Sequence, residues 1–143
     1  MNKHLLWLPV ILTVGATAYN PVKEAKAPKI ENKNISFAIY KRSDYQSSVY
    51  NTSTAQVHII VEKVDINGSR TAVWDTTMTP KSLSQYPSVD KVMPENIVIH
   101  GVNRKKEHIE VSYLLTYNSD GNELQMQGDE IISGTNNNIS IKI

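Results

Sequence analysis

Tyrosines and small polar residues gather between residues 40 and 54. Tyr40, Tyr45 and Tyr50 are spaced five residues apart in a segment that otherwise contains mainly Ser, Asp, Gln, Asn and Thr. This composition is typical of adaptable binding loops, because tyrosine joins a rigid ring to a hydroxyl and the small side chains supply hydrogen bonds. The segment therefore predicts a loop whose tyrosine rings stack on a ligand such as a sugar. The alternative is that these rings only cover the edge of a core.

Two histidines flank a basic turn that contains Arg104, Lys105 and Lys106. If residues 103–105 form a short hairpin loop, His100 and His108 lie opposite each other, and a third ligand would complete a zinc or copper site. The sequence places no carboxylate to complete it. We therefore favour two surface imidazoles, and we predict neither a metal ion nor a cofactor.

The basic turn itself suggests contact with phosphate or a sulfated glycan. A run of three charges at a hairpin end is more often simply solvated, and Glu107 and Glu110 follow at once. Oxygen-bearing residues Asn118, Asp120 and Asn122 begin like a calcium loop, but Glu123 stands where such a loop needs glycine. Both clusters are better explained by turns than by ligands.

Motifs of catalysis are missing from the sequence. It contains no G-x-S-x-G elbow, no H-E-x-x-H pair and no glycine loop that could hold phosphate. The absence of cysteine excludes disulfides, thiolate metal sites and a cysteine nucleophile. A formal net charge of +1 gives no electrostatic reason to expect nucleic acid or an anionic membrane surface as a partner. These observations predict a protein that is not an enzyme.

The clearest structural signal is a hairpin over residues 107–128. Every second residue from Ile109 to Tyr117 is a large apolar or aromatic one, and Asp120-Gly121 suits the two positive-φ positions of a type I′ turn. That register sets Tyr117 opposite Leu124 and Leu115 opposite Met126, so the apolar residues of both strands share one face. We interpret this face as core.

A second hairpin is predicted over residues 55–78, with Asn67-Gly68 as its turn. A two-residue loop pairs Asp65 with Arg70 across the strands and, further along, Val61 with Trp74. Further strands are expected at residues 35–41, 96–102 and 139–143, with a short irregular strand around Val49. The proline-spaced segment 79–95 reads as a connection containing one helical turn near residues 82–85.

About seven strands without a helical period indicate an all-β fold. We predict an antiparallel β-sandwich over residues 35–143, immunoglobulin-like or transthyretin-like in architecture. A small closed β-barrel is the alternative, because strand number alone does not separate the two.

The N-terminus has the layout of a secretory signal over residues 1–18. A basic start at Lys3 precedes an apolar run too short to span a membrane, and Ala16-Thr17-Ala18 is a small-x-small cleavage site. Residues 19–34 read as a flexible leader. A signal without any cysteine favours an exported bacterial protein, secreted or periplasmic, with no stable membrane insertion after cleavage.

These observations favour a non-catalytic binding module at the cell envelope. Its expected ligand is a carbohydrate or a protein, held by Tyr40, Tyr45 and Tyr50. The alternative is a structural or accessory subunit of a surface assembly that pairs through an exposed edge such as residues 139–143. The sequence does not fix the oligomeric state.

Overall fold

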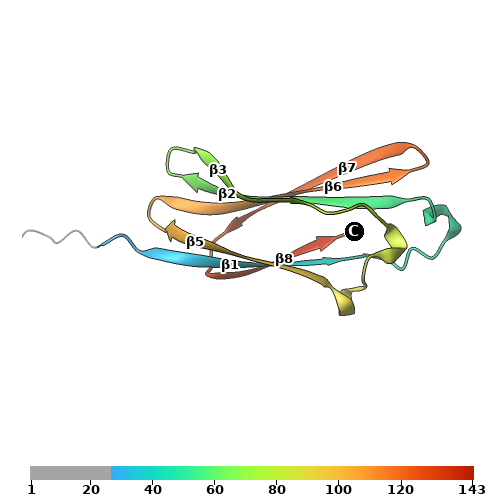
Figure 1. Ribbon diagram of the computed structural model, residues 1–143, viewed down its shortest axis with the longest axis horizontal. Helices are drawn as coiled ribbons and strands as arrows, with labels where there is room; N and C mark the ends of the chain where they lie inside the picture. Colours follow the sequence, from blue (N-terminus) through green and yellow to red (C-terminus); the bar gives the residue numbers. More distant parts are fainter. Residues whose placement is uncertain (1–26) are drawn as a thin grey trace, which may run out of the picture.

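The computed structural model describes residues 27–143; the predicted signal peptide and residues 19–26 of the predicted leader lie outside this range. Within residues 27–143 the chain forms two stacked β-sheets, and the only helical elements there are three short 3-10 turns. Figure 1 shows the two layers edge-on, with most strands running along the length of the molecule.

The first sheet contains three strands and the second contains five. The first is built from β1 (Ile30–Tyr40), β5 (Met93–Asn103) and β8 (Asn136–Lys142), in the order β5-β1-β8. The second contains β2 (Thr54–Asp65), β3 (Arg70–Thr77), β4 (Lys81–Ser82), β6 (Glu107–Ser119) and β7 (Asn122–Ile132). Its order is β3-β2-β6-β7, with β4 beside β2. The 3-10 turns are η1 (Ser48–Tyr50), η2 (Leu83–Gln85) and η3 (Val89–Lys91).

Two open sheets make the molecule a β-sandwich, which confirms the predicted fold class, and no closed barrel forms. One strand pair departs from the predicted antiparallel arrangement, because β8 pairs with β1 in parallel. The chain changes sheets between β7 and β8, so no tight turn forces β8 to run against a neighbour. The division into three and five strands also differs from the four and three of an immunoglobulin constant domain.

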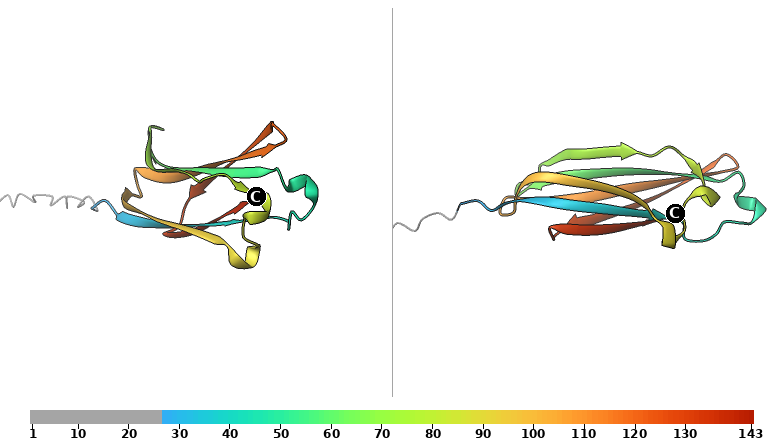
Figure 2. Two further views of the ribbon diagram at one scale, coloured as in Figure 1. Left: turned by 45° about the vertical axis from the view of Figure 1, so that its right-hand side comes forward. Right: turned by 60° about the horizontal axis from the view of Figure 1, so that its bottom comes forward.

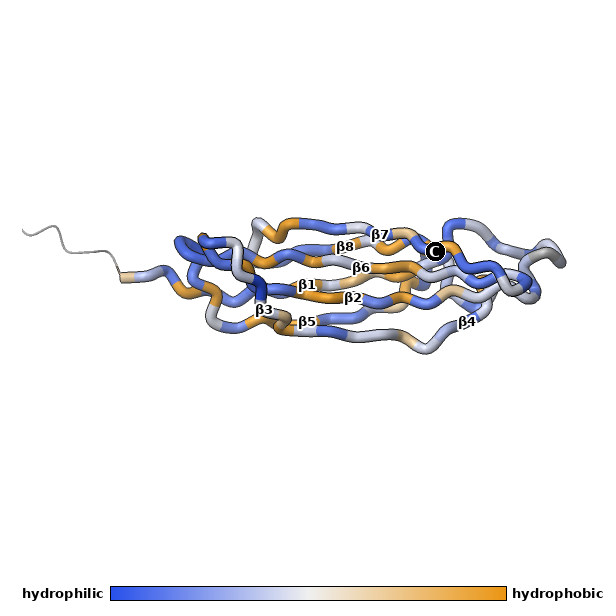
Figure 3. The backbone as a smooth tube through the Cα atoms, turned by 90° about the horizontal axis from the view of Figure 1, so that it is seen from above, coloured by the Kyte–Doolittle hydropathy of each residue, from blue (hydrophilic) through white to orange (hydrophobic). Residues whose placement is uncertain are grey.

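The core lies between the central strands, where every second residue points inward. Stacking of Phe37 on Trp74, with ring centroids 5.5 Å apart, joins the two layers. The buried aliphatic side chains include Ile35, Ile39, Val57, Ile59, Val61, Ile109, Val111, Ile139 and Ile141. Figure 3 shows this apolar content as orange segments along β1 and β2.

The buried residue Tyr86 holds the connection between β3 and β5 against the core. Its hydroxyl donates a hydrogen bond to the Ala55 carbonyl oxygen at 2.9 Å, and burial raises the pKa of this phenol. Leu83 is buried beside it at the start of η2, which confirms the predicted helical turn. The predicted strand around Val49 is wrong, because that residue lies in η1.

The β6–β7 hairpin has the predicted register. Tyr117 pairs with Leu124 and Leu115 pairs with Met126, and the turn places Asp120 at φ 50° and Gly121 at φ 79°. The second strand extends beyond the predicted hairpin of residues 107–128, because β7 continues to Ile132. Its backbone continues to pair with β6 as far as Ile132.

The β2–β3 hairpin pairs Val61 with Trp74 as predicted, but the predicted pairing of Asp65 with Arg70 is wrong. A bulge after Val61 shifts the register by one residue, so Arg70 lies opposite Val64. Asp65 instead closes the turn, where its carboxylate accepts hydrogen bonds from the N–H groups of Asn67 and Ser69. These bonds, above all the one from Ser69, hold the pKa of Asp65 below its usual value.

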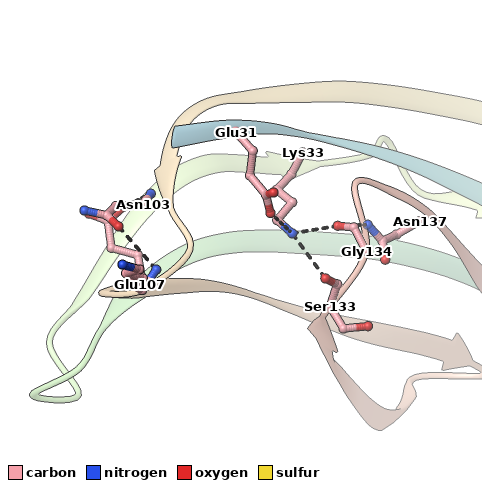
Figure 4. A network of polar contacts seen from close by, with 8 residues as sticks. Glu31, Lys33, Asn103, Glu107, Ser133, Gly134 and Asn137 are labelled. Atoms are coloured by element: carbon pink, nitrogen blue, oxygen red, sulfur yellow. Dashed lines mark hydrogen bonds and ion pairs between the residues drawn. The ribbon is translucent and has the colours of Figure 1, made fainter. Parts of the chain in front are cut away.

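The first strand begins earlier than predicted, so the flexible leader is wrong for residues 30–34. Lys33 explains why this polar stretch is ordered (Figure 4). Its side chain is buried, and the ammonium forms an ion pair with Glu31 at 2.7 Å and donates to the carbonyl oxygens of Gly134 at 2.7 Å and Ser133 at 3.3 Å. A buried charge needs such partners. They fasten the start of β1 to the turn between β7 and β8.

Candidate functional site

A difference in width between the sheets leaves one side of the sandwich open. The second sheet extends through β6 to β7, whereas the first ends at β8. Figure 1 shows the end of the β6–β7 hairpin rising away from the lower layer, and Figure 2 shows the same separation after rotation. Seen from above, β7 is the outermost strand on that side and β8 lies next to it (Figure 3). β7 therefore overhangs the smaller sheet.

Under this overhang is a cavity of about 780 Å³, open to solvent. This volume lies within the usual range of about 300–1,000 Å³ for small-molecule and cofactor sites. Its lining combines aromatic, aliphatic and polar side chains from β6, β7, β8 and the loop after β1. Among them are Arg42, Tyr45, Tyr50, Tyr113, Leu115, Tyr117, Leu124, Met126, Ser140, Lys142 and Ile143.

Two of the three predicted binding tyrosines lie at this cavity. Tyr45 and Tyr50 pack edge to face, with ring centroids 5.1 Å apart. The Tyr45 hydroxyl donates a hydrogen bond to the carbonyl oxygen of Ile143 at 2.7 Å, which anchors the loop to the end of the smaller sheet. Tyr40 is half-buried at the end of β1 and does not line the cavity. Tyr45 and Tyr50 therefore share one cavity, and Tyr40 lies apart from it.

Two further tyrosines come from the hairpin that the sequence assigned to the core. Tyr113 and Tyr117 are only partly buried and line the cavity from β6. Gly128 lies opposite Tyr113, and a Cβ atom at position 128 would overlap the Tyr113 ring.

Burial raises the pKa of Tyr45 and of Tyr117. These phenols stay protonated at neutral pH, so their hydroxyls keep the ability to donate hydrogen bonds.

The interpretation of the hairpin's apolar face as core fails for β7. Leu124 is 61% exposed and Met126 is 53% exposed, although both point to the same side as the buried Leu115. They are uncovered because the smaller sheet, as far as residues 27–143 form it, ends at β8. One signal was available in the sequence: between residues 122 and 130 these are the only large apolar side chains, which is typical of an edge strand.

Charged and polar groups lie at the cavity's border. Arg42 and Lys142 come from the layer of the smaller sheet, and Glu123 comes from β7. Ser53 and Ser119 share a hydrogen bond of 2.7 Å between their hydroxyls. Tyrosine rings, aliphatic groups and scattered hydrogen-bonding groups equip the cavity to bind and orient a ligand.

The cross-strand pairing of His100 with His108, on which a metal site would depend, does not form. β5 pairs with β1 and β6 pairs with β2, so His100 and His108 belong to different sheets. His108 Nε2 instead lies 2.9 Å from Glu110 Oε1. Across residues 27–143, no three metal-ligating His, Asp or Glu side chains gather in one place.

Ionic contacts on the outer face of the larger sheet join three strands rather than forming a site. Arg70 on β3 bridges Glu62 on β2 at 2.8 Å and Glu110 on β6 at 2.6 Å. The bond from His108 and the nearby Arg70 lower the pKa of Glu110. All three charged groups are partly exposed, so their contribution to stability is modest.

Comparison with protein-family models, with curated proteins and with solved structures gives no significant match to this chain. Within the described range, no helix has the length and apolarity needed to cross a membrane.

Proposed function

We propose that this protein is a non-catalytic binding module whose ligand, a carbohydrate or a protein, occupies the cavity beneath β7. The observation that supports this most strongly is the convergence of Tyr45, Tyr50, Tyr113 and Tyr117 on one open cavity. Tyrosine is favoured at binding surfaces because it offers a large rigid contact area at low conformational entropy cost and also a hydroxyl.

The site of action proposed with this function is the bacterial cell envelope or its surroundings. The proposal rests on the signal-like segment at residues 1–18, followed by a chain without cysteine. In this proposal the chain is exported, the signal is removed before Tyr19, and the β-sandwich acts outside the cytoplasm.

Paired tyrosine substitutions test the proposed ligand site. An oligosaccharide array and a peptide library are screened with the protein, and the affinity of each hit is then measured for Tyr50→Ala and Tyr40→Ala. We expect Tyr50→Ala to weaken binding about tenfold or more, as loss of a hot-spot aromatic does. Tyr40→Ala is the matched control and should bind normally. Unchanged binding after Tyr45 and Tyr50 are both replaced by alanine would reject the site.

A second candidate function is that of a subunit or accessory of a surface assembly that pairs through β8. The observation that favours it is the position of β8, which has β1 on one side and no neighbour among the described strands on the other. A protein that runs as a strict monomer at high concentration, with or without its last five residues, would count against it.

A further inference from the structure

The free edge of β8 carries an ordered row of backbone hydrogen-bonding groups. The Ile143 N–H donates to the Tyr40 carbonyl oxygen at 2.9 Å, and the Arg42 N–H donates to the Ile143 carbonyl oxygen at 2.8 Å. Successive residues of a strand direct their backbone N–H and C=O groups to opposite sides. Those of Ile139 and Ile141 therefore also point toward β1. It follows that Asn138, Ser140 and Lys142 direct their N–H and C=O groups toward the open side.

That open side is where the cavity lies. Ser140, Lys142 and Ile143 of the smaller sheet line it together with Leu124 and Met126 of β7. A strand hydrogen-bonded to the open side of β8 would lie about 4.8 Å from β8 and would extend the smaller sheet by one strand. Stacked sheets lie about 10 Å apart. Such a strand would run beneath β7 and turn alternate side chains toward Leu124 and Met126.

We propose that the cavity is a strand-acceptor site, in which an extended segment of a partner protein adds to β8 and inserts alternate apolar side chains beneath β7. This inference rests on the proposed function and narrows its ligand to a polypeptide. Addition of a strand to a sheet edge is an established mode of peptide recognition, in which backbone bonds give affinity and side-chain pockets give specificity. The added strand would give the smaller sheet a fourth strand opposite β7.

A polypeptide fits this site better than a sugar, because the cavity is bordered by backbone hydrogen-bonding groups along β8 and by apolar side chains along β7. The β8 border offers alternating N–H donors and C=O acceptors at the spacing of a strand, which another backbone satisfies in full. The β7 border offers the side chains of Leu124 and Met126, which are more than half exposed and gain from contact with apolar groups.

A second copy of this sandwich pairing through its own β8 would not fill the cavity. Ile139, Ile141 and Ile143 are already buried in their own core, and Ser140 and Lys142 are polar. The occupant must therefore bring apolar side chains that are not yet buried. Residues 136–142 of β8 set the length of the contact, so a segment of about seven residues with apolar groups at every second position matches it.

A tethered donor strand tests the proposal within the full chain. A flexible Gly-Ser linker of about ten residues, then seven residues alternating valine and threonine, is added after Ile143, at the end of the cavity. A control carries the same donor residues in block order, valines first. We expect the alternating donor to raise the thermal unfolding midpoint by about 5 °C or more over the block control. Equal midpoints for the two fusions would overturn the proposal.

Substitutions in β7 test whether the stabilising donor strand binds at the cavity. Leu124→Lys with Met126→Lys is expected to leave the unfused protein folded, because both side chains are largely exposed, and to abolish the gain from the alternating donor. A gain that survives these substitutions would show that the donor binds elsewhere and would contradict the proposal. So would an unfused dimer that the same substitutions dissociate, since the occupant would then be a second copy. If the donor fails but an oligosaccharide binds in a Tyr50-dependent way, the peptide inference falls and the binding function stands.

Discussion

Replacing Leu124 with alanine is expected to destabilise the protein far less than replacing Leu115 with alanine. Both leucines belong to the inner face of the same hairpin, but Leu124 is 61% exposed whereas Leu115 is 3% exposed. Full burial of a leucine side chain is worth about 1.5–3 kcal/mol, so the covered share of about 39% at Leu124 is worth about 0.6–1.2 kcal/mol. Removal of a fully buried leucine costs about 2–5 kcal/mol, because it also leaves an empty space.

Urea denaturation of the two variants beside the unmodified protein measures this difference. We expect the loss of unfolding free energy for Leu115→Ala to be at least about twice that for Leu124→Ala, with unchanged dependence on denaturant. A Leu124→Ala variant as unstable as Leu115→Ala would show that β7 is covered in solution. The interpretation of the overhang as an open acceptor would then be refuted.

Two further predictions concern the parts of the fold that position the site. Tyr86→Phe removes the hydrogen bond to the Ala55 carbonyl and is expected to lower the unfolding free energy by about 0.5–1.5 kcal/mol, measured by urea denaturation; an unchanged stability would contradict this role. The lowered pKa of Asp65 gives stability that is present above its ordinary value of 3.8 and is lost as the pH falls through the folded-state pKa. Asp65→Asn should therefore lose less stability on acidification than the unmodified protein, and parallel acid unfolding curves would argue against the turn bonds.

Local patterns in the sequence predicted most of the strands because each pattern carries its own geometry. Alternating apolar residues and a positive-φ turn specify the β6–β7 register without any knowledge of the rest of the chain, and the pairing of Leu115 with Met126 confirms it. The Asn67-Gly68 turn was less informative, since a bulge after Val61 shifts the register by one residue. The early start of β1 was missed, because the carbonyl oxygens that hold Lys33 in place lie about a hundred residues away in the sequence.

The site was harder to predict, because it arises from the number of strands in each layer. Alternation shows which face of β7 is apolar, but only the sheet order shows that none of the described strands covers that face. Tyr45 and Tyr50 were found through the composition of their loop, whereas Tyr113 and Tyr117 carry the same pattern as core residues. A sequence-based search for cavities therefore needs strand order as well as periodicity.

Hydrogen exchange along β8 in the free protein tests the central claim most directly. If the edge is an open acceptor, the amides of Ile139 and Ile141, which face β1, exchange slowly, while those of Asn138, Ser140 and Lys142 exchange at least about tenfold faster. This alternation with a period of two is the result we expect from residue-resolved measurement by NMR. Uniformly slow exchange at all five amides would show that the edge is already covered, and it would contradict the account of the cavity as a vacant strand site.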